Sequence, residues 1–251
     1  LSKKIQSITG LIIDPYFSAS KINWMLNNSS DLRRKATEGK VAFGTVDSWL
    51  LWNLTDKKIH VTDGTNASRT MLYNIHELDW DEELLELWKI PRTLLPEVIP
   101  TAGEYGTTSI LTGTSVPITA VAGDQQAALI GQMCFTPGTI KCTYGTGCFA
   151  LMNTGDNPVS TDSGLLTTIA YKSKSSAEYA LEGSVFMGGA TIQWLRDGIE
   201  IINSSEEVEA LASSVKDTNG IVFVPAFTGL GAPYWDPSAR GMIIGLNRET
   251  N

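Results

Sequence analysis

The chain has 251 residues and a net charge of −8, from 19 Lys and Arg against 27 Asp and Glu. Hydrophobic residues make up 42% and charged residues 18%, a composition typical of a globular protein, which excludes a disordered or fibrous one. The acidic balance argues against nucleic acid or an anionic membrane surface as a partner. No apolar run in the sequence reaches the ~20 residues that a membrane-spanning helix needs.

Hydrophobic periodicity, capping residues and turn residues predict the following elements in chain order. The first third is mostly helical, with helices over 21–26, from Ser30 to Gly39, from Asp47 or Ser48 to Leu54, and from an Asp79 cap to Pro91, and a strand over 41–45. The rest of the chain has a strand over 116–121, a helix over 125–132, strands over 139–144, 148–152, 165–170 and 178–181, a helix over 190–202, a helix opened by the capping box Ser204-x-x-Glu207, and strands over 221–224 and 242–246.

This mixture of strands and helices predicts an α/β architecture. The four strands between 139 and 181 are separated by turn residues, which favours a meander. Because the chain changes from helix-rich to strand-rich after Gln132, we expect two domains, 1–132 and 133–251.

The cysteines, Cys134, Cys142 and Cys148, are odd in number, and their spacing is not that of metal ligands. They therefore indicate neither a disulfide framework nor a metal site, and a reducing, cytoplasmic location is expected.

The chain starts with Leu1 rather than Met and stops at Asn251 directly after an apolar run. We therefore expect it to be part of a longer protein.

The segment Gly123-Asp124-Gln125 places a carboxylate where a strand ends and a helix begins. In α/β sheets, ligands bind in the crevice beyond the carboxyl ends of the strands. A carboxylate there can accept a proton from a hydroxyl group or face a magnesium ion, and the neighbouring amide of Gln125 can bind a polyol. The alternative is that Asp124 only caps the helix, which is the commoner role for an arbitrary segment of this kind.

Two glycine-containing segments could bind phosphate. In Gly145-Thr146-Gly147, glycine allows backbone N–H groups to approach a phosphate, and the threonine hydroxyl adds a donor; the alternative is a plain hairpin turn. Gly188-Gly189 opens a helix whose N-terminus attracts anions; the alternative is close helix packing. The sequence has no Walker lysine motif and no Gly-x-Gly-x-x-Gly fingerprint.

Tyr16 lies at a junction between a loop and a helix. Its hydroxyl group could contact a small polar ligand there, although a tyrosine in such a place more often packs with its hydroxyl bonded locally.

Several motifs occur in an order that resembles the glycerol kinase branch of the FGGY carbohydrate kinase family. They are Phe43-Gly44-Thr45-Val46-Asp47-Ser48-Trp49, His60-Val61-Thr62-Asp63, Thr65-Asn66-Ala67-Ser68-Arg69-Thr70, Ala122-Gly123-Asp124-Gln125-Gln126, Tyr144-Gly145-Thr146-Gly147-Cys148-Phe149 and 225–237. The resemblance implies the actin-like, ribonuclease H-like fold of a two-lobed kinase. It also implies that only the end of the first lobe (1–132) and the start of the second (133–251) are present, so that the chain alone is inactive.

The resemblance further implies ATP-dependent phosphorylation of glycerol to sn-glycerol 3-phosphate by a cytoplasmic homo-oligomer. Asp124 would be the general base and would face Mg²⁺ indirectly. The glycerol would be held by Tyr16, Asp124, Gln125 and Phe149, and the nucleotide by Gly145, Thr146, Gly189 and Gln193. Two alternatives remain open: a kinase for a related sugar or polyol, and a non-catalytic actin-like binding module.

Overall fold

The computed structural model describes residues 1–110, 113–248 and 250. The chain forms two compact units that alternate along the sequence. The first unit comprises Leu1–Lys141, Leu151–Thr161 and Leu166–Glu182, and the second comprises Cys142–Ala150, Asp162–Leu165 and Gly183–Asn251. The domain boundary after residue 132 stays a prediction. Within the described residues, no helix has both the length and the hydrophobicity to cross a membrane.

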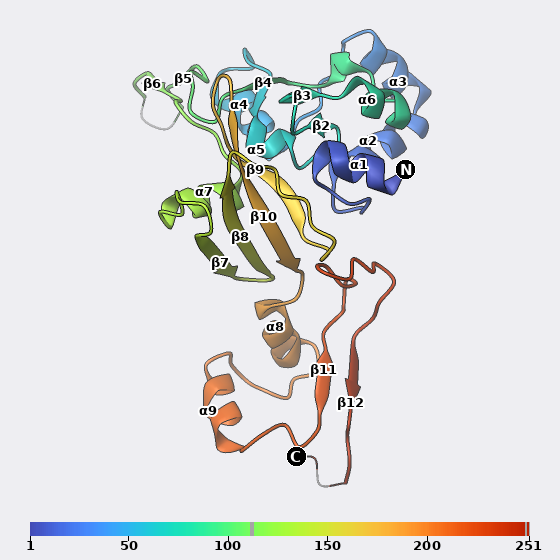
Figure 1. Cartoon of the computed structure of the whole chain (residues 1–251), viewed down its shortest axis with the longest axis vertical. Helices are drawn as coiled ribbons and strands as arrows, with labels where there is room; N and C mark the ends of the chain where they lie inside the picture. Colours follow the sequence, from blue (N-terminus) through green and yellow to red (C-terminus); the bar gives the residue numbers. More distant parts are fainter. Residues whose placement is uncertain (111–112, 249, 251) are drawn as a thin grey trace. The chain divides into compact units, whose positions relative to one another are not determined.

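The first unit begins with a series of helices, of which those at 2–9 and 64–67 were not predicted from the sequence (Figure 1). They are α1 (Ser2–Thr9), α2 (Ser18–Asn27), α3 (Ser30–Thr37), α4 (Val46–Leu54), the short α5 (Gly64–Ala67) and α6 (Glu82–Trp88), followed by the 3₁₀ turn η1 (Arg92–Leu94). The predicted helix over 21–26 is confirmed as part of α2, which buries Ala19, Ile22 and Leu26 along one stripe.

Four predictions in this region are wrong in detail. Residues 41–45 form no strand, because the backbone of Phe43 bonds instead to the carbonyl of Leu94 and to the ring of His60. Helix α3 is capped by the hydroxyl group of Ser29, not Ser30. Helix α6 is capped by Asp81, because Asp79 belongs to a strand (Asp79–Trp80). It also ends at Trp88, before the predicted Pro91.

Short strand pairs connect these helices. They are the parallel pair β1 (Val61–Asp63) with β4 (Glu97–Ile99), and the antiparallel pairs β2 (Tyr73–Asn74) with β3 (Asp79–Trp80) and β5 (Thr107–Thr108) with β6 (Val116–Pro117). The strand predicted over 116–121 is thus confirmed only at its start, and residues 118–121 pair with 101–106 through isolated hydrogen bonds. A hydrophobic core of Leu51, Val61 and Tyr105 lies beneath α4 and β1.

The four strands predicted between 139 and 181 are confirmed as β7 (Ile140–Tyr144), β8 (Cys148–Gly155), β9 (Leu166–Lys172) and β10 (Ala177–Val185). Their order in the sheet is β7-β8-β10-β9, so the predicted simple meander is wrong: β10 lies between β8 and β9. Helix α7 (Asp124–Gly131) lies beside this sheet (Figure 1). Leu129 of α7 shares a buried cluster with Cys134, Leu151, Ala170 and Ala180.

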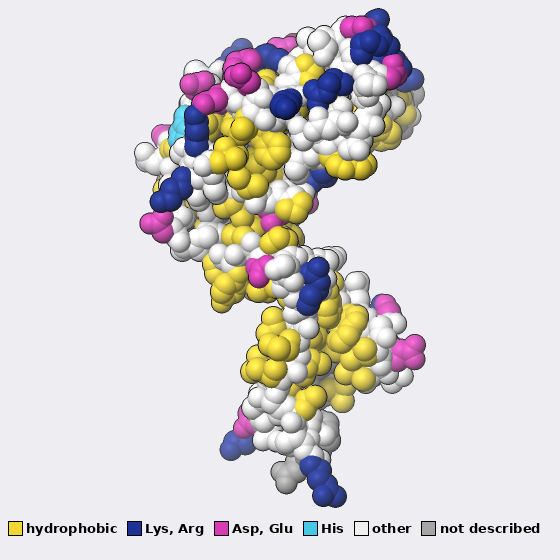
Figure 2. All heavy atoms as spheres, turned by 90° about the vertical axis from the view of Figure 1, so that its right-hand side faces the viewer, with side chains coloured by type: hydrophobic (Ala, Val, Ile, Leu, Met, Phe, Trp, Pro, Cys, Tyr) yellow, Lys and Arg dark blue, Asp and Glu magenta, His cyan; other side chains and the backbone are white. Residues whose placement is uncertain are grey.

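The second unit also contains α8 (Gly189–Asp197), α9 (Glu207–Ser214) and the antiparallel pair β11 (Val222–Val224) with β12 (Met242–Ile244). Trp194 of α8 packs against Phe223 and Phe227, with ring centroids 5.7 and 4.7 Å apart. The capping box is wrong: α9 begins at Glu207, whose carboxylate accepts from the N–H of Asn203. Figure 2 shows hydrophobic side chains on the surface of this unit, where Val222, Met242 and Ile244 are exposed.

Candidate functional site

Asp124 is the first residue of α7, and its side chain is exposed to solvent. The residue in the cap position is Gly123, and no side chain caps this helix, so Asp124 does not have the structural role that its sequence context favoured. One carboxylate oxygen, Oδ1, accepts from the backbone N–H of Gln125 at 2.9 Å. The other, Oδ2, lies 3.4 Å from Nε2 of the same residue. The carboxylate is therefore accessible and oriented by its neighbour.

A buried carboxylate holds the backbone just before Asp124. Asp63, at the end of β1, is fully buried and accepts hydrogen bonds from Thr65, Asn66 and Thr101. The hydroxyl oxygen of Thr65 accepts in turn from the backbone N–H of Gly123 at 2.8 Å. These hydrogen bonds link residues 60–66 to the start of α7. The motif at 60–66 therefore helps to hold the backbone of the Gly123-Asp124-Gln125 segment in place.

Gln125 is half-buried, and the ammonium group of Lys141 on β7 donates a hydrogen bond to its Oε1 atom. Lys141 is only 4% exposed. The sequence reasoning missed this residue. The signal that could have found it is the alternation of β7, in which Lys141 takes a buried position between exposed Ile140 and Cys142.

Tyr16 lies directly before α2 and is 48% exposed. Its N–H donates to Asp14 at 2.7 Å, and its ring meets that of Phe17 edge-on at 5.3 Å. The guanidinium group of Arg69 lies 6.0 Å from the ring centroid of Tyr16 and 5.5 Å from that of Phe17. Arg69 also forms an ion pair at 2.8 Å with Glu182, whose side chain is 2% exposed. A buried acid thus holds the cation against the two rings.

In the second unit, the structure brings Gly145, Thr146 and Gly189 together. The turn between β7 and β8 accepts from the start of α8: the N–H of Gly189 donates to Gly145 O at 2.7 Å, and those of Gly188 and Ala190 to Thr146 O at 2.7 and 3.1 Å. A Cβ on Gly189 would lie 2.8 Å from the Gly145 oxygen. The alternatives to phosphate binding, a hairpin turn at 145–147 and close helix packing at 188–189, therefore both describe this contact. The first N–H groups of α8 already have hydrogen-bond acceptors within the protein.

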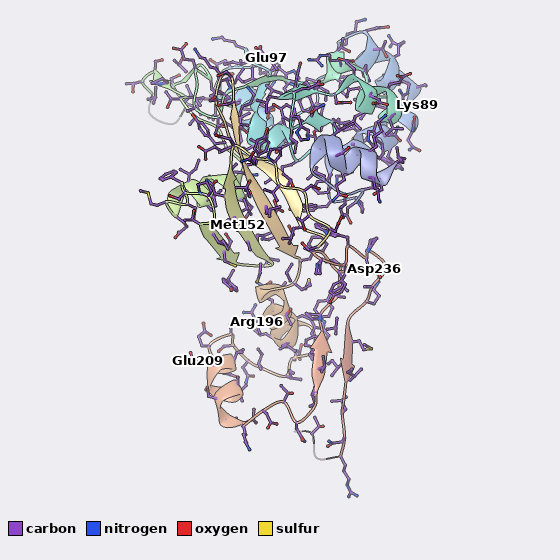
Figure 3. The ribbon with its side chains drawn as sticks, in the orientation of Figure 1. Lys89, Glu97, Met152, Arg196, Glu209 and Asp236 are labelled. Carbon is purple, nitrogen blue, oxygen red and sulfur yellow. The ribbon has the colours of Figure 1, made fainter. Side chains whose placement is uncertain are left out.

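The other predicted ligand-binding residues of this unit lie nearby in the sequence. Gln193 is exposed on α8, and the hydroxyl-bearing Thr146 is exposed in the turn. Phe149 is half-buried on β8. Figure 3 labels Arg196 on the same helix as Gln193, and Arg196 pairs with its neighbour Asp197 at 2.6 Å.

Among the described residues, no group of three or more His, Cys, Asp and Glu side chains lies close enough together to bind a metal ion. Magnesium in phosphoryl-transfer sites needs only one or two carboxylates beside phosphate and water oxygens. The exposed carboxylate of Asp124 fits that mode. The three cysteines are free.

Comparisons with known proteins cover both halves of the chain. Residues 1–131 match the N-terminal domain, and residues 140–251 the C-terminal domain, of the FGGY family of carbohydrate kinases. Glycerol kinase 1 of Clostridium tetani is 60% identical over 99% of this chain, and glycerol kinase of Shewanella sp. (strain ANA-3) is 58% identical over 100%. The chain spans about half the length of these relatives, 50% and 51%.

Solved structures of carbohydrate kinases resemble this chain over its whole length. The crystal structure of Plasmodium falciparum glycerol kinase with ADP matches 100% of this chain and 50% of its own, with a TM-score of 0.85 and 39% identity. Ligand-bound xylulose kinase from Lactobacillus acidophilus matches 100% of this chain and 50% of its own, with a TM-score of 0.82 and 24% identity, and supports the fold alone. The predicted α/β fold, actin-like and ribonuclease H-like, is therefore confirmed. The chain belongs to the FGGY family of carbohydrate kinases.

Proposed function

We propose that a protein of the relatives' full length containing this sequence, here called the full-length protein, phosphorylates glycerol with ATP to give sn-glycerol 3-phosphate. The observation that carries the proposal is the exposed carboxylate of Asp124, anchored through Gly123 and Thr65 to the buried Asp63, in a chain 60% identical to a glycerol kinase.

Asp124 acts as the general base that takes the proton from the attacking hydroxyl of glycerol. Phosphoryl transfer asks little covalent chemistry of a protein: it needs the nucleophile in line with the phosphorus atom and a group that accepts its proton. A carboxylate at the first position of a helix suits this role, because backbone hydrogen bonds fix its place while its side chain remains accessible.

Tyr16 and Gln125 hold the hydroxyl groups of glycerol, and Phe149 packs against its carbon atoms. Tyr16 is supported by the exposure of its ring and by Arg69, which restricts that ring. Gln125 offers both a donor and an acceptor next to the base.

Gly145, Thr146, Gly189 and Gln193 line the nucleotide site. The N–H groups of Gly188, Gly189 and Ala190 hold the turn to α8, so the exposed Thr146 hydroxyl and the Gln193 amide are the groups that would contact ATP.

Asp124 would face Mg²⁺ indirectly, and this ion, when bound, would neutralise charge on the phosphates. Residues 1–132 would supply the base and the contacts to the hydroxyl groups of glycerol, and residues 133–251 would supply Phe149 and the nucleotide contacts. The cytoplasmic location and homo-oligomeric state stay predictions.

The test is a substrate panel on the purified full-length protein, with ADP release measured for glycerol, a pentulose and other polyols. We expect glycerol to have the highest kcat/KM. Preferential phosphorylation of a pentulose would support the related sugar kinase, and no ADP release with any acceptor would support the non-catalytic binding module.

A further inference from the structure

We propose that Lys141 is a positioning residue that sets the orientation of the Gln125 amide and, through it, of the Asp124 carboxylate. This inference rests on the proposed function, because it concerns how the proposed base and glycerol contacts are held in place.

The first support is the burial of Lys141. It is 4% exposed, and its ammonium group donates to Oε1 of Gln125. Burying an ammonium group is costly unless polar partners compensate for the lost water, so buried lysines are rare. The burial therefore calls for a role that an apolar side chain at this position of β7 could not fill.

The second support is the chemistry of the contact. A lysine ammonium carries three donors and no acceptor, so only the oxygen of the Gln125 amide can face it. That constraint turns the NH₂ group the other way, and Nε2 lies 3.4 Å from Oδ2 of Asp124. The backbone N–H of Gln125 bonds to Oδ1 at 2.9 Å. Both oxygens of the carboxylate thus face donors of one residue, whose amide orientation Lys141 selects.

Without Lys141, the Gln125 amide could rotate by half a turn and present its oxygen to the carboxylate. That arrangement would set two acceptors against each other, so Asp124 would turn away from it. Glycerol would then meet both a misplaced amide and a misplaced base. Misplacing a reacting group by about 1 Å can cost on the order of 100-fold in rate.

The experiment compares Lys141→Met with Lys141→Gln in the full-length protein. The two new side chains have similar size and no charge, but only Gln can donate a hydrogen bond to Gln125. We expect kcat/KM for glycerol to fall about 10- to 100-fold in Lys141→Met, by analogy with the loss of groups that orient ligands in other sites. It should fall clearly less in Lys141→Gln, and the KM for ATP should not change in either variant.

The matched control is Lys172→Met. Lys172 is a buried lysine of β9, 6% exposed, whose ammonium group bonds to the carbonyl of Ser173 and not to Gln125. It should keep the wild-type glycerol kinetics. A second arm adds Lys141→Met to Gln125→Ala, where no further loss of kcat/KM is expected, because Lys141 acts through the amide that is already gone.

Equal glycerol kinetics in Lys141→Met and Lys141→Gln, wild-type kinetics in Lys141→Met, or a full additional loss in the Gln125→Ala background would overturn the proposal. If Lys141→Met does not fold, Gln125→Glu decides. That variant keeps an acceptor for Lys141, but its side chain has no donor for Oδ2 of Asp124, so its Tm should hold while its kcat falls at least about tenfold; a lowered Tm or a wild-type kcat would contradict us. Glycerol turnover by the wild-type protein separately tests the proposed function.

Discussion

Replacing Asp63 by Asn should destabilise the protein far more than the same change at Asp47, although both carboxylates are buried. Oδ1 of Asp63 accepts from Thr65 Oγ1 at 2.8 Å and from both nitrogens of Asn66 at 3.0 and 2.9 Å. Oδ2 accepts from the N–H of Thr65 at 3.0 Å and the hydroxyl of Thr101 at 2.7 Å. Oδ1 thus accepts from three donors and Oδ2 from two. An Asn side chain would therefore place its NH₂ group at the Oδ2 position, where it would face fewer donors.

The hydroxyl group of Thr101 can rotate and accept from that NH₂ group, but the backbone N–H of Thr65 cannot. One buried N–H is then left facing another donor, which costs about 1–3 kcal/mol, and the remaining bonds lose their charge-assisted part. We expect a total loss of about 3 kcal/mol. For a domain of this size, that corresponds to a fall in Tm of roughly 6–12 °C.

Asp47 is the matched control because its two side-chain partners are hydroxyl groups, those of Thr45 and Thr62, which can donate or accept. Burial raises the pKa of Asp47, so its charged form is already disfavoured in the fold. Asp47→Asn should therefore shift the Tm by less than about 3 °C. Calorimetry of the full-length variants measures both shifts. Equal losses of Tm at the two positions would contradict this prediction.

The remaining predictions concern pH, glycine and the buried ion pair. Because burial raises the folded-state pKa of Asp47, the wild type should lose stability relative to Asp47→Asn as the pH rises through that raised value; Tm differences between about pH 4 and 7 measure this. Gly10→Ala should lower the Tm much more than Gly39→Ala: both glycines have positive φ, but only at Gly10 would a Cβ lie 2.2 Å from a backbone oxygen; similar Tm values would contradict this. Arg69→Met should cost about 3–5 kcal/mol, since it removes the cation that pairs with buried Glu182, and Glu182→Gln combined with it should recover part of the Tm; no recovery would count against the ion pair.

The sequence predicted most helices and the strands of the large sheet, because their periodicity and turn residues act locally. It failed at 41–45, where an apolar stretch looks like a strand but its backbone groups bond to a distant loop carbonyl and a histidine ring. The order of β9 and β10 in the sheet was also wrong, since strand order depends on long-range pairing that turn residues do not encode.

For the candidate site, the sequence placed Asp124 correctly at a helix start but could not exclude that it was a cap. That distinction depends on which residue has non-helical backbone angles, and here it is Gly123. The role of Asp63 in holding Gly123 through Thr65 joins residues nearly sixty positions apart, so only the fold shows it. Lys141 was missed because a single lysine in a strand reads as a solvent-facing residue until burial is known.

The most direct test of Asp124 as the base is the variant Asp124→Asn in the full-length protein, with ATP-dependent glycerol phosphorylation and glycerol binding measured side by side. Asn keeps the shape of the side chain and its hydrogen bond from Gln125, but it cannot accept the proton of the attacking hydroxyl. We expect kcat to fall by at least about 100-fold while glycerol still binds with a measurable Kd. Near-wild-type turnover would contradict the assignment of Asp124 as the base.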